Sequence, residues 1–475
     1  MVIEGALVLG VEGFRLGSVM VRDGRIAAVA HGVDDCAGLR QQAREVVDAA
    51  GCWLIPGLID AHAHGYAPLL RGTENSLPLE LWALYTVLYG RAFDGAAIRA
   101  AVLLGAAERI RGGVTGVIDH SPYVGLWPEA LAAHEASGLR VGYAAFLHDV
   151  SDYDLLGMTL PDSIADLVGG APALDAGAYA GRFAELVQAA RGGSGRVGVQ
   201  LGPNAPQRCS PAAWALWREL RERHGLPVHL HLMETRAQAM IGRRDWEGGL
   251  LAEMGRRDLL APGLSAAHGI WLDERERARL GEAGATVIHN PASNLMLGSG
   301  VMNLLSYRAL GVKLALGTDS ANTGGRADLF EVMRLAMMLP RIATPDPAAW
   351  PRAPEVLGMA TRNGAAVLGL GGQVGVIAPG QLADLALVRH DRAATVAMHR
   401  DVAALVQYGS PDAVDSVMVG GAWVMRMGRI LAFDEGAAVA AAEAAAAAIA
   451  GRVGVGVAAL DAALPGLARE FRRAG

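Results

Sequence analysis

The protein is 475 residues long, with 52% hydrophobic and 19% charged residues. This composition excludes an intrinsically disordered chain, and the length accommodates two or three domains, or one large barrel with an appendage. The formal net charge is -6 with both signs interspersed, so no basic stripe indicates binding to nucleic acid or to a membrane. The three cysteines are Cys36, Cys52 and Cys209, which are far apart and form no CxxC pair. This excludes a thiolate zinc site and favours a reducing, cytoplasmic location.

In chain order, the sequence predicts three kinds of segment. Residues 1–56 and 373–434 alternate short apolar runs with Gly-containing turns, so we expect all-β segments that pair into one small β-sandwich domain. Between them, residues 57–372 contain β-type runs that alternate with helical stretches, and the first run begins just before residue 57. The eight runs are LIPGLIDAH, TGVIDH, RVGYAAFLH, RVGVQLGP, PVHLHLME, LSAAHGI, ATVIHN and KLALGTD. Residues 435–475 predict a helical tail, broken by the Gly-rich RVGVGV.

Eight strands that alternate with helices predict an α/β fold, a (β/α)8 TIM barrel formed by residues 57–372. Catalytic groups of such barrels lie at the carboxyl ends of the strands. In this sequence the runs end in polar residues, taken strand by strand: His62 and His64, Asp119 and His120, His148 and Asp149, Asn204, His231 and Glu234, His268, His289 and Asn290, and Asp319. We therefore expect one polar site at the mouth of the barrel.

A metal centre is the simplest use of this set. His62 and His64 are two residues apart on a strand, so both imidazoles face the barrel mouth. His231, His268 and Asp319 each add one ligand from a later strand, and nitrogen with carboxylate oxygen suits Zn²⁺, with Fe²⁺ as the alternative. His229 shares the face of His231 one layer deeper, where packing below the metal is the favoured role.

Other residues of the set are predicted to move protons. Glu234 follows the ligand His231 at a bend, where a carboxylate can take a proton from a metal-bound water and pass it to a leaving group. Asp319 can both bind the metal and accept a hydrogen bond from that water. His289 is placed opposite the metal, as a donor to the substrate atom that gains negative charge. The single lysine, Lys313, begins the eighth run, so no strand-four lysine is present to bridge two metals, and one divalent ion is predicted.

These motifs together resemble the amidohydrolase superfamily, in its branch of triazine hydrolases and S-adenosylhomocysteine/methylthioadenosine deaminases. The likeness is carried by PGLIDAHAH, HLHLMETR, AAHGIWL, HNPASNLMLGSG and LGTDS. It implies a metal-dependent barrel with a small split β domain, holding one zinc or iron, with Glu234 as proton shuttle and His289 as electrophilic helper. It also implies four substrate-binding positions: Trp82, Arg91, Asn204 and Asn294.

Two of these positions depart from the nucleoside deaminases. Arg91 stands where those enzymes have a ribose-binding glutamate, nine residues after Trp82. Asn204 replaces the histidine of their GPHSPY turn. Both departures argue against adenosine-type substrates. We expect Arg91 or Arg208 to face the pocket and to bind an acidic or carbonyl-rich edge of the substrate.

The leading hypothesis is a metal-dependent aminohydrolase. A metal-bound hydroxide would attack an N-heterocycle of the purine, pterin, pyrimidine or s-triazine type and release ammonia or an amine. Hydrolytic dechlorination, or ring opening of a cyclic amide or amidine, are alternatives on the same scaffold. A barrel kept only as a non-catalytic scaffold is the third hypothesis, and the complete ligand set argues against it. The expected partners are a small N-heterocyclic substrate and further copies of the chain, as a homodimer or larger oligomer.

Overall fold

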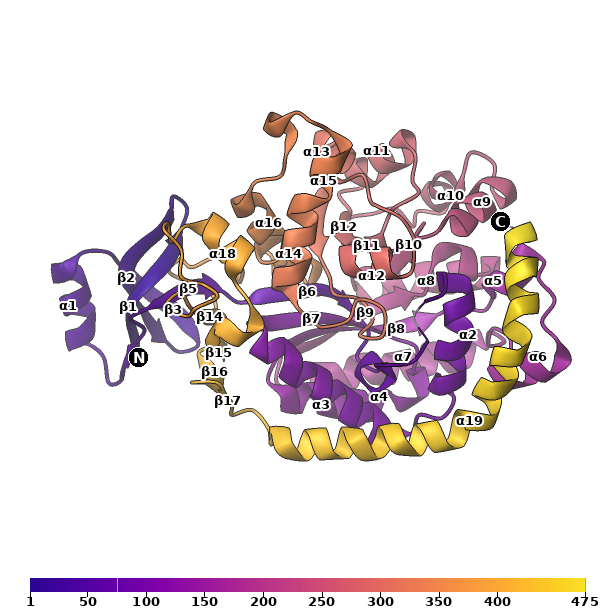
Figure 1. The fold of residues 1–475 in the computed structure, drawn as a ribbon, viewed down its shortest axis with the longest axis horizontal. Helices are drawn as coiled ribbons and strands as arrows, with labels where there is room; N and C mark the ends of the chain where they lie inside the picture. Colours follow the sequence, from indigo (N-terminus) through magenta and orange to yellow (C-terminus); the bar gives the residue numbers. More distant parts are fainter. Residues whose placement is uncertain (75, 475) are drawn as a thin grey trace.

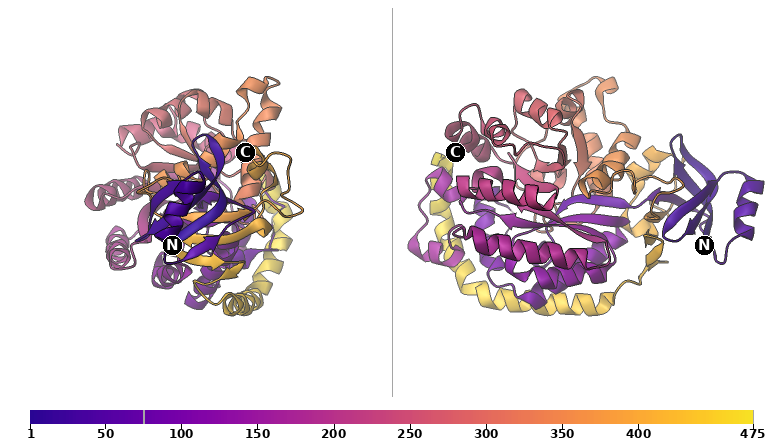
Figure 2. Two further views of the ribbon diagram at one scale, coloured as in Figure 1. Left: turned by 90° about the vertical axis from the view of Figure 1, so that its left-hand side faces the viewer. Right: turned by 180° about the vertical axis from the view of Figure 1, so that it is seen from behind.

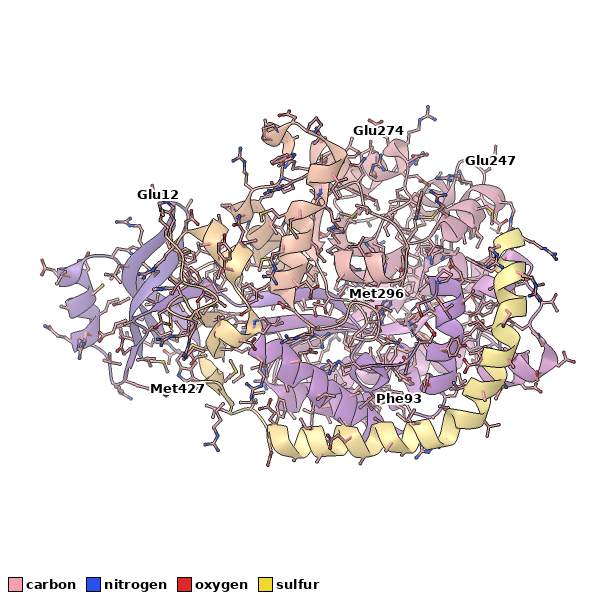
Figure 3. All side chains as sticks on the ribbon, in the orientation of Figure 1. Glu12, Phe93, Glu247, Glu274, Met296 and Met427 are labelled. Atoms are coloured by element: carbon pink, nitrogen blue, oxygen red, sulfur yellow. The ribbon has the colours of Figure 1, made fainter. Side chains whose placement is uncertain are left out.

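The computed structural model describes residues 1–74 and 76–474. Asn75, within the loop before Trp82, and Gly475, the last residue of the predicted tail, lie outside the described residues. Two sheets and a long carboxyl-terminal helix organise the chain (Figure 1). Side chains fill the barrel and the layer between its strands and helices (Figure 3).

The first sheet is the predicted barrel, and all eight predicted strands are present in it. Its neighbours follow the sequence order and pair in parallel, which is the topology of a (β/α)8 barrel. The strands are β6 (Leu58–Ala63), β7 (Val114–Ser121), β8 (Arg140–Leu147), β9 (Val197–Pro203), β10 (Val228–Leu232), β11 (Leu264–His268), β12 (Thr286–His289) and β13 (Lys313–Leu316). The predicted TIM-barrel fold is confirmed.

The second sheet combines both ends of the chain into nine strands, at the left of Figure 1. In it β14 from the carboxyl-terminal part pairs antiparallel with β5 from the amino-terminal part. The strands are β1 (Val2–Gly10), β2 (Gly13–Arg22), β3 (Arg25–Ala30), β4 (Val46–Asp48), β5 (Cys52–Pro56), β14 (Leu385–Arg389), β15 (Val414–Val419), β16 (Ala422–Arg426) and β17 (Arg429–Ile430). The predicted domain boundaries at residues 56, 372 and 434 stay a prediction.

Helices surround the barrel, seen from the opposite side in Figure 2, and α1 lies apart from them against β1–β3 of the nine-stranded sheet. They are α1 (Val33–Gln41), α2 (Leu79–Gly90), α3 (Gly95–Arg111), α4 (Trp127–Ser137), α5 (Asp152–Leu156), α6 (Asp162–Val168), α7 (Ala176–Arg191), α8 (Pro211–His224), α9 (Arg236–Asp245), α10 (Leu250–Arg256), α11 (Glu274–Glu282), α12 (Pro291–Met296), α13 (Leu304–Ala309), α14 (Leu329–Met338), α15 (Pro340–Ala343), α16 (Ala353–Met359), α17 (Arg362–Val367), α18 (Val402–Tyr408) and α19 (Glu435–Ala474). Side-chain caps fix several starts; for example, Asp94 accepts the Ala97 N–H at the start of α3.

Three details differ from the sequence-based expectations. The two flanking segments are not all-β, because α1 and α18 interrupt them. Helix α1 has Asp34 and Asp35 in its first turn and Arg40 in its last, the charge order that stabilises a helix dipole. The tail is not broken at RVGVGV, since α19 continues through it and bends around the barrel (Figure 1).

The run LIPGLIDAH is also two strands, divided at Gly57. The residues before it belong to the nine-stranded sheet, and those after it begin the barrel. A Cβ at Gly57 would lie 2.1 Å from Thr115 Oγ1, so only glycine lets the chain cross so close to β7. This crossing brings His62 and His64 to the barrel mouth directly from the small sheet.

Candidate active site

The predicted ligands converge on one point at the carboxyl end of the barrel. Asp319 Oδ1 lies 3.4 Å from His62 Nε2 and 3.3 Å from His64 Nε2. His231 Nε2 lies 3.3 Å from His64 Nε2, and His268 Nε2 lies 3.8 Å from Asp319 Oδ2. All five side chains are buried. Four strands, or the residues directly after them, therefore present four imidazoles and one carboxylate to a shared centre.

Hydrogen bonds behind the rings set the tautomers of three of these histidines. His64 Nδ1 donates to the His120 carbonyl at 2.6 Å, and His231 Nδ1 donates to the Asn204 carbonyl at 2.7 Å. A carbonyl only accepts, so Nδ1 must hold the proton and Nε2 keeps a free lone pair. His268 Nδ1 lies 2.8 Å from Asn294 Oδ1, which favours the same tautomer.

The fourth histidine is oriented by a longer chain. His62 Nδ1 lies 2.7 Å from His229 Nε2, and His229 Nδ1 lies 2.8 Å from Ser265 Oγ. The Ser265 hydroxyl donates to the Val228 carbonyl at 3.1 Å. Because the chain ends on an obligate acceptor, each donor in it points away from the centre, and His62 Nε2 also faces the site unprotonated. His229 therefore lies one layer deeper, as predicted, and holds a ligand in place.

This donor set fits a divalent metal ion. The Nε2 atoms of His62 and His268 are buried and have no hydrogen-bond partner among the described residues. Burial lowers the pKa of His62 to about 4, so its imidazole stays neutral and able to coordinate at physiological pH. Nitrogen ligands with one carboxylate oxygen suit Zn²⁺ or Fe²⁺. His120 adds a further imidazole within reach of His62 and His231, although we did not predict it as a ligand.

Backbone strain is concentrated at the same place. His268 has φ 76° and Asp319 has φ 64°, left-handed values that are unusual for residues other than glycine. Met233, next to Glu234, has φ 44°. Such conformations cost about 1–3 kcal/mol each, and they persist at sites where the surrounding structure enforces them. The strained residues aim both ligands and Glu234 at the shared centre.

Glu234 lies at the edge of the cluster. Its Oε2 is 3.6 Å from His268 Nε2, and its Oε1 accepts the Ser299 hydroxyl at 3.0 Å. Burial raises the pKa of Glu234, so the carboxyl group binds a proton more readily than an exposed glutamate. By contrast, the pKa of Asp319 lies well below its usual value, because the nearby imidazoles of His62 and His64 favour the carboxylate and outweigh the effect of burial. The two carboxyl groups thus have pKa values shifted in opposite directions, as acid–base chemistry requires.

A cavity of about 400 Å³ opens above the cluster. Of the four predicted substrate-binding residues, Trp82, Arg91 and Asn204 line it. Asn294 is not among the lining residues, and its Oδ1 contacts His268 instead. His289 is buried and also outside the lining; burial lowers its pKa to about 3. The roles assigned to these residues stay predictions.

One wall of the cavity carries an ion pair that the sequence did not reveal. The Arg208 guanidinium forks onto Asp152, with Nε 2.9 Å from Oδ1, and also donates to Asn204 Oδ1 at 2.8 Å. Arg208 therefore lines the cavity with its charge balanced by Asp152. The partner could not be found from sequence, because Asp152 lies 56 residues away at the start of α5, in a segment without a motif.

Of two further lining residues on one strand, the sequence predicted His148 at the barrel mouth but not Phe146. Phe146 and His148 line the cavity, and they alternate on β8 and its end in the way His62 and His64 do on β6. Counting back two residues from His148 along the strand would have found Phe146. Burial lowers the pKa of His148 to about 4, so it offers a neutral imidazole to the cavity.

Known proteins share the whole architecture. The 5-methylthioadenosine/S-adenosylhomocysteine deaminase of Pyrococcus furiosus is 33% identical over 443 residues, which covers 92% of this chain and 97% of that protein. The crystal structure of an adenosine deaminase from Xanthomonas campestris with bound zinc superposes with a TM-score of 0.83 at 27% identity, over 94% of this chain and 98% of that one. The zinc complex of an atrazine chlorohydrolase from Arthrobacter aurescens TC1 shares the fold, with a TM-score of 0.82 at 21% identity over 94% and 99%.

These likenesses confirm the predicted branch and reaction class, since the relatives at 27% and 33% identity are named as deaminases. They also confirm zinc as the metal to expect, because the Xanthomonas campestris structure holds it. The amidohydrolase family model matches residues 53–424, which include every candidate ligand. The chain belongs to the amidohydrolase family.

Proposed function

We propose that the protein is a hydrolytic deaminase that binds one zinc ion and removes an amino group, as ammonia or an amine, from an aromatic N-heterocycle. The observation that carries the proposal is the cluster of Nε2 lone pairs with Glu234 at its edge. Iron is the alternative metal. We further propose that the enzyme acts in the cytoplasm as a homodimer or larger oligomer.

His62, His64, His231, His268 and Asp319 would hold the ion. When bound, it supplies Lewis-acid chemistry that makes water acidic enough to act as a nucleophile near neutral pH. Asp319 keeps its negative charge because its pKa is low, so it can ligate and accept a hydrogen bond from the attacking water. Burial lowers the pKa values of His62 and His231, so these two imidazoles add no positive charge that would repel the ion.

Glu234 would move the protons. Ser299 fixes one oxygen of its carboxyl group, and the other faces the cluster beside His268. The carboxylate takes a proton from the attacking water and gives it to the ring nitrogen or the departing amine. Water adds to the carbon that bears the amino group, the C–N bond breaks, and the products are a carbonyl heterocycle and ammonia. The raised pKa of Glu234 suits both halves of this transfer.

Release of ammonia from the zinc-loaded protein tests the proposal. We expect one or more of a panel of aminopurines, aminopterins, aminopyrimidines and amino-s-triazines to give ammonia and the matching carbonyl compound. Mass spectrometry of the product separates this from ring opening, which retains the nitrogen, and from dechlorination, which releases chloride. Ring-opened product, or no turnover of any amine while cyclic amides are hydrolysed, would contradict the proposal.

A further inference from the structure

Helix α2 (Leu79–Gly90) forms one wall of the cavity and contributes several polar groups to it. Trp82, Thr86 and Gly90 recur every four residues, so they lie on one face of the helix, and Arg91 follows at its end. All four residues line the cavity. A substrate bound in the cavity therefore lies against this face of α2.

Two of these groups are buried and unsatisfied. Trp82 is 7% exposed, and its indole Nε1 has no hydrogen-bond partner among the described residues. Thr86 Oγ1 is also buried without a partner in that part of the chain. Leaving such a donor unpaired typically costs about 1–3 kcal/mol, so unpaired donors beside a cavity indicate a ligand that accepts hydrogen bonds.

The third group supplies charge. Arg91 donates to the Asp166 carbonyl at 3.4 Å and forms no ion pair with any residue that the structure describes. Its guanidinium packs against Gly169, where a Cβ would lie 2.8 Å from Nη1. Arg208, the other arginine of the cavity, is neutralised by Asp152. The uncompensated positive charge at the cavity wall is therefore that of Arg91.

From these observations we propose that the substrate carries a carboxylate on an arm that extends from its heterocycle, and that Arg91 binds this carboxylate. A guanidinium and a carboxylate pair through two parallel hydrogen bonds. Thr86 and Trp82 donate to the remaining acceptors of the arm. The part of this inference that concerns the heterocycle rests on the proposed function.

Binding measurements test the inference without requiring turnover. In a Glu234→Gln background, isothermal titration would use adenine and diamino-s-triazine, each carrying either a carboxypropyl arm or the uncharged carboxamidopropyl arm. We expect the carboxylate probe of at least one ring to bind roughly tenfold tighter than its amide counterpart, the range for a charged hydrogen bond at a partly solvated site. This preference should shrink as salt is raised, because the pair is accessible to solvent.

The Arg91→Gln variant should abolish the preference while leaving binding of the amide probes unchanged. Arg99→Gln is the matched control: Arg99 is exposed on α3, is not part of the cavity lining, and its loss changes the net charge equally. If Arg91 served only to cap the end of α6, its variant would lose thermal stability and keep the preference. Equal binding of both arms, no binding of any probe, or a preference retained in Arg91→Gln would overturn the inference.

The outcome also separates the two proposals. A carboxylate preference without ammonia release from these probes by the unmutated zinc-loaded enzyme would support the arm site and contradict deamination of these rings. Ammonia release without any carboxylate preference would support the proposed function and reject the arm site.

Discussion

Glu234 is the residue on which the proposed chemistry depends most directly. Replacing it by glutamine keeps its size and the contact with Ser299 but removes the titratable group. We expect Glu234→Gln to retain its zinc and lose about 10²–10⁴-fold in kcat, the usual contribution of a general acid–base. Metal analysis and kinetics on the same preparation check this. His231→Ala is the contrasting variant, because it should lose the metal itself; a Glu234→Gln enzyme that loses metal and keeps its rate would show that Glu234 is a ligand.

The chain from His62 to Ser265 gives a second prediction at this scale. Removing His229 leaves His62 Nδ1 without its partner, so the ring can rotate or change tautomer. We expect His229→Ala to weaken zinc binding by about 10–100-fold, as loss of a group that orients a ligand commonly does. Ser265→Ala should have a smaller effect in the same direction. Competition with a chromogenic chelator measures both, with the exposed His399→Ala as control; unchanged affinity in His229→Ala would mean that packing alone positions His62.

Glu80 links the start of α2 to the loop of Glu234, since its carboxyl group accepts the hydroxyl of Thr235. Burial raises the pKa of Glu80 to about 7, so the folded protein holds this proton more tightly than the unfolded chain does. The contribution of Glu80 to stability is therefore most favourable below about pH 4.5 and is lost as pH rises through 7.

Glu80→Gln keeps an acceptor for Thr235 and cannot ionise. We expect the variant and the wild type to have the same free energy of unfolding near pH 4.5. As the pH rises to 7, the variant should become more stable than the wild type, by at most about 3 kcal/mol, and its melting temperature should rise accordingly. Thermal unfolding of both proteins across this pH range checks the trend. A difference that stays constant with pH would mean that Glu80 is ionised throughout.

At the scale of elements, helix α19 packs against α2, on the side of α2 that faces away from the cavity. Its Val453, Leu460 and Leu467 are buried in one cluster with side chains of α2 and α6, and Tyr85 of α2 donates to Asp461 at 2.7 Å. The opposite face of α2 lines the cavity. Although α19 is long and apolar enough to cross a membrane by length and composition, in this fold it runs along the barrel (Figure 2).

Leu460→Ala should therefore loosen the cavity wall from behind. Truncating a fully buried leucine costs about 2–5 kcal/mol, and here the loss falls on the contact between α19 and α2. We expect faster hydrogen exchange in α2 and a raised KM with kcat nearly unchanged, because the metal cluster lies on other elements. Val455→Ala, at an 87% exposed position of the same helix, is the control. Equal exchange in both variants would show that α2 is held by the barrel alone.

Elements with a strong local pattern were predictable, and those that depend on tertiary contacts were not. The eight barrel strands and their polar ends follow from alternation and from turn residues, which is why His62, His231 and Asp319 could be brought together from sequence. Helix α19 passes through a glycine-rich stretch because Gly456 packs against Leu88 and Leu167, a contact that no local propensity contains. The same holds for Asp152, whose position opposite Arg208 depends on where the short helix α5 packs.

For the whole molecule, the decisive feature is the seam that closes the barrel. Strands β6 and β13 are about 250 residues apart in sequence, and one isolated bridge joins Ala63 of β6 to Asp319, three residues after the end of β13. Buried Asp60 supports the seam by accepting Thr318 N at 2.8 Å, Thr318 Oγ1 at 2.7 Å and Arg109 Nε at 2.9 Å. Two of the candidate metal ligands come from β6 and its end, and a third follows β13, so a bound ion would join both sides of this seam.

Removing the metal should therefore weaken the barrel at one place before others. At a free zinc concentration 100 times Kd, binding adds about 2.7 kcal/mol to the free energy of unfolding. A chelator removes this contribution, so the melting temperature should fall. We expect hydrogen exchange to rise most in β6 and β13 on chelation and to fall again when zinc is restored. Strands β8 and β9, paired continuously from Val141 to Leu147, provide the internal reference. Exchange that rises equally in β8 and β9, or a melting temperature independent of zinc, would show that the barrel closes without help from its metal.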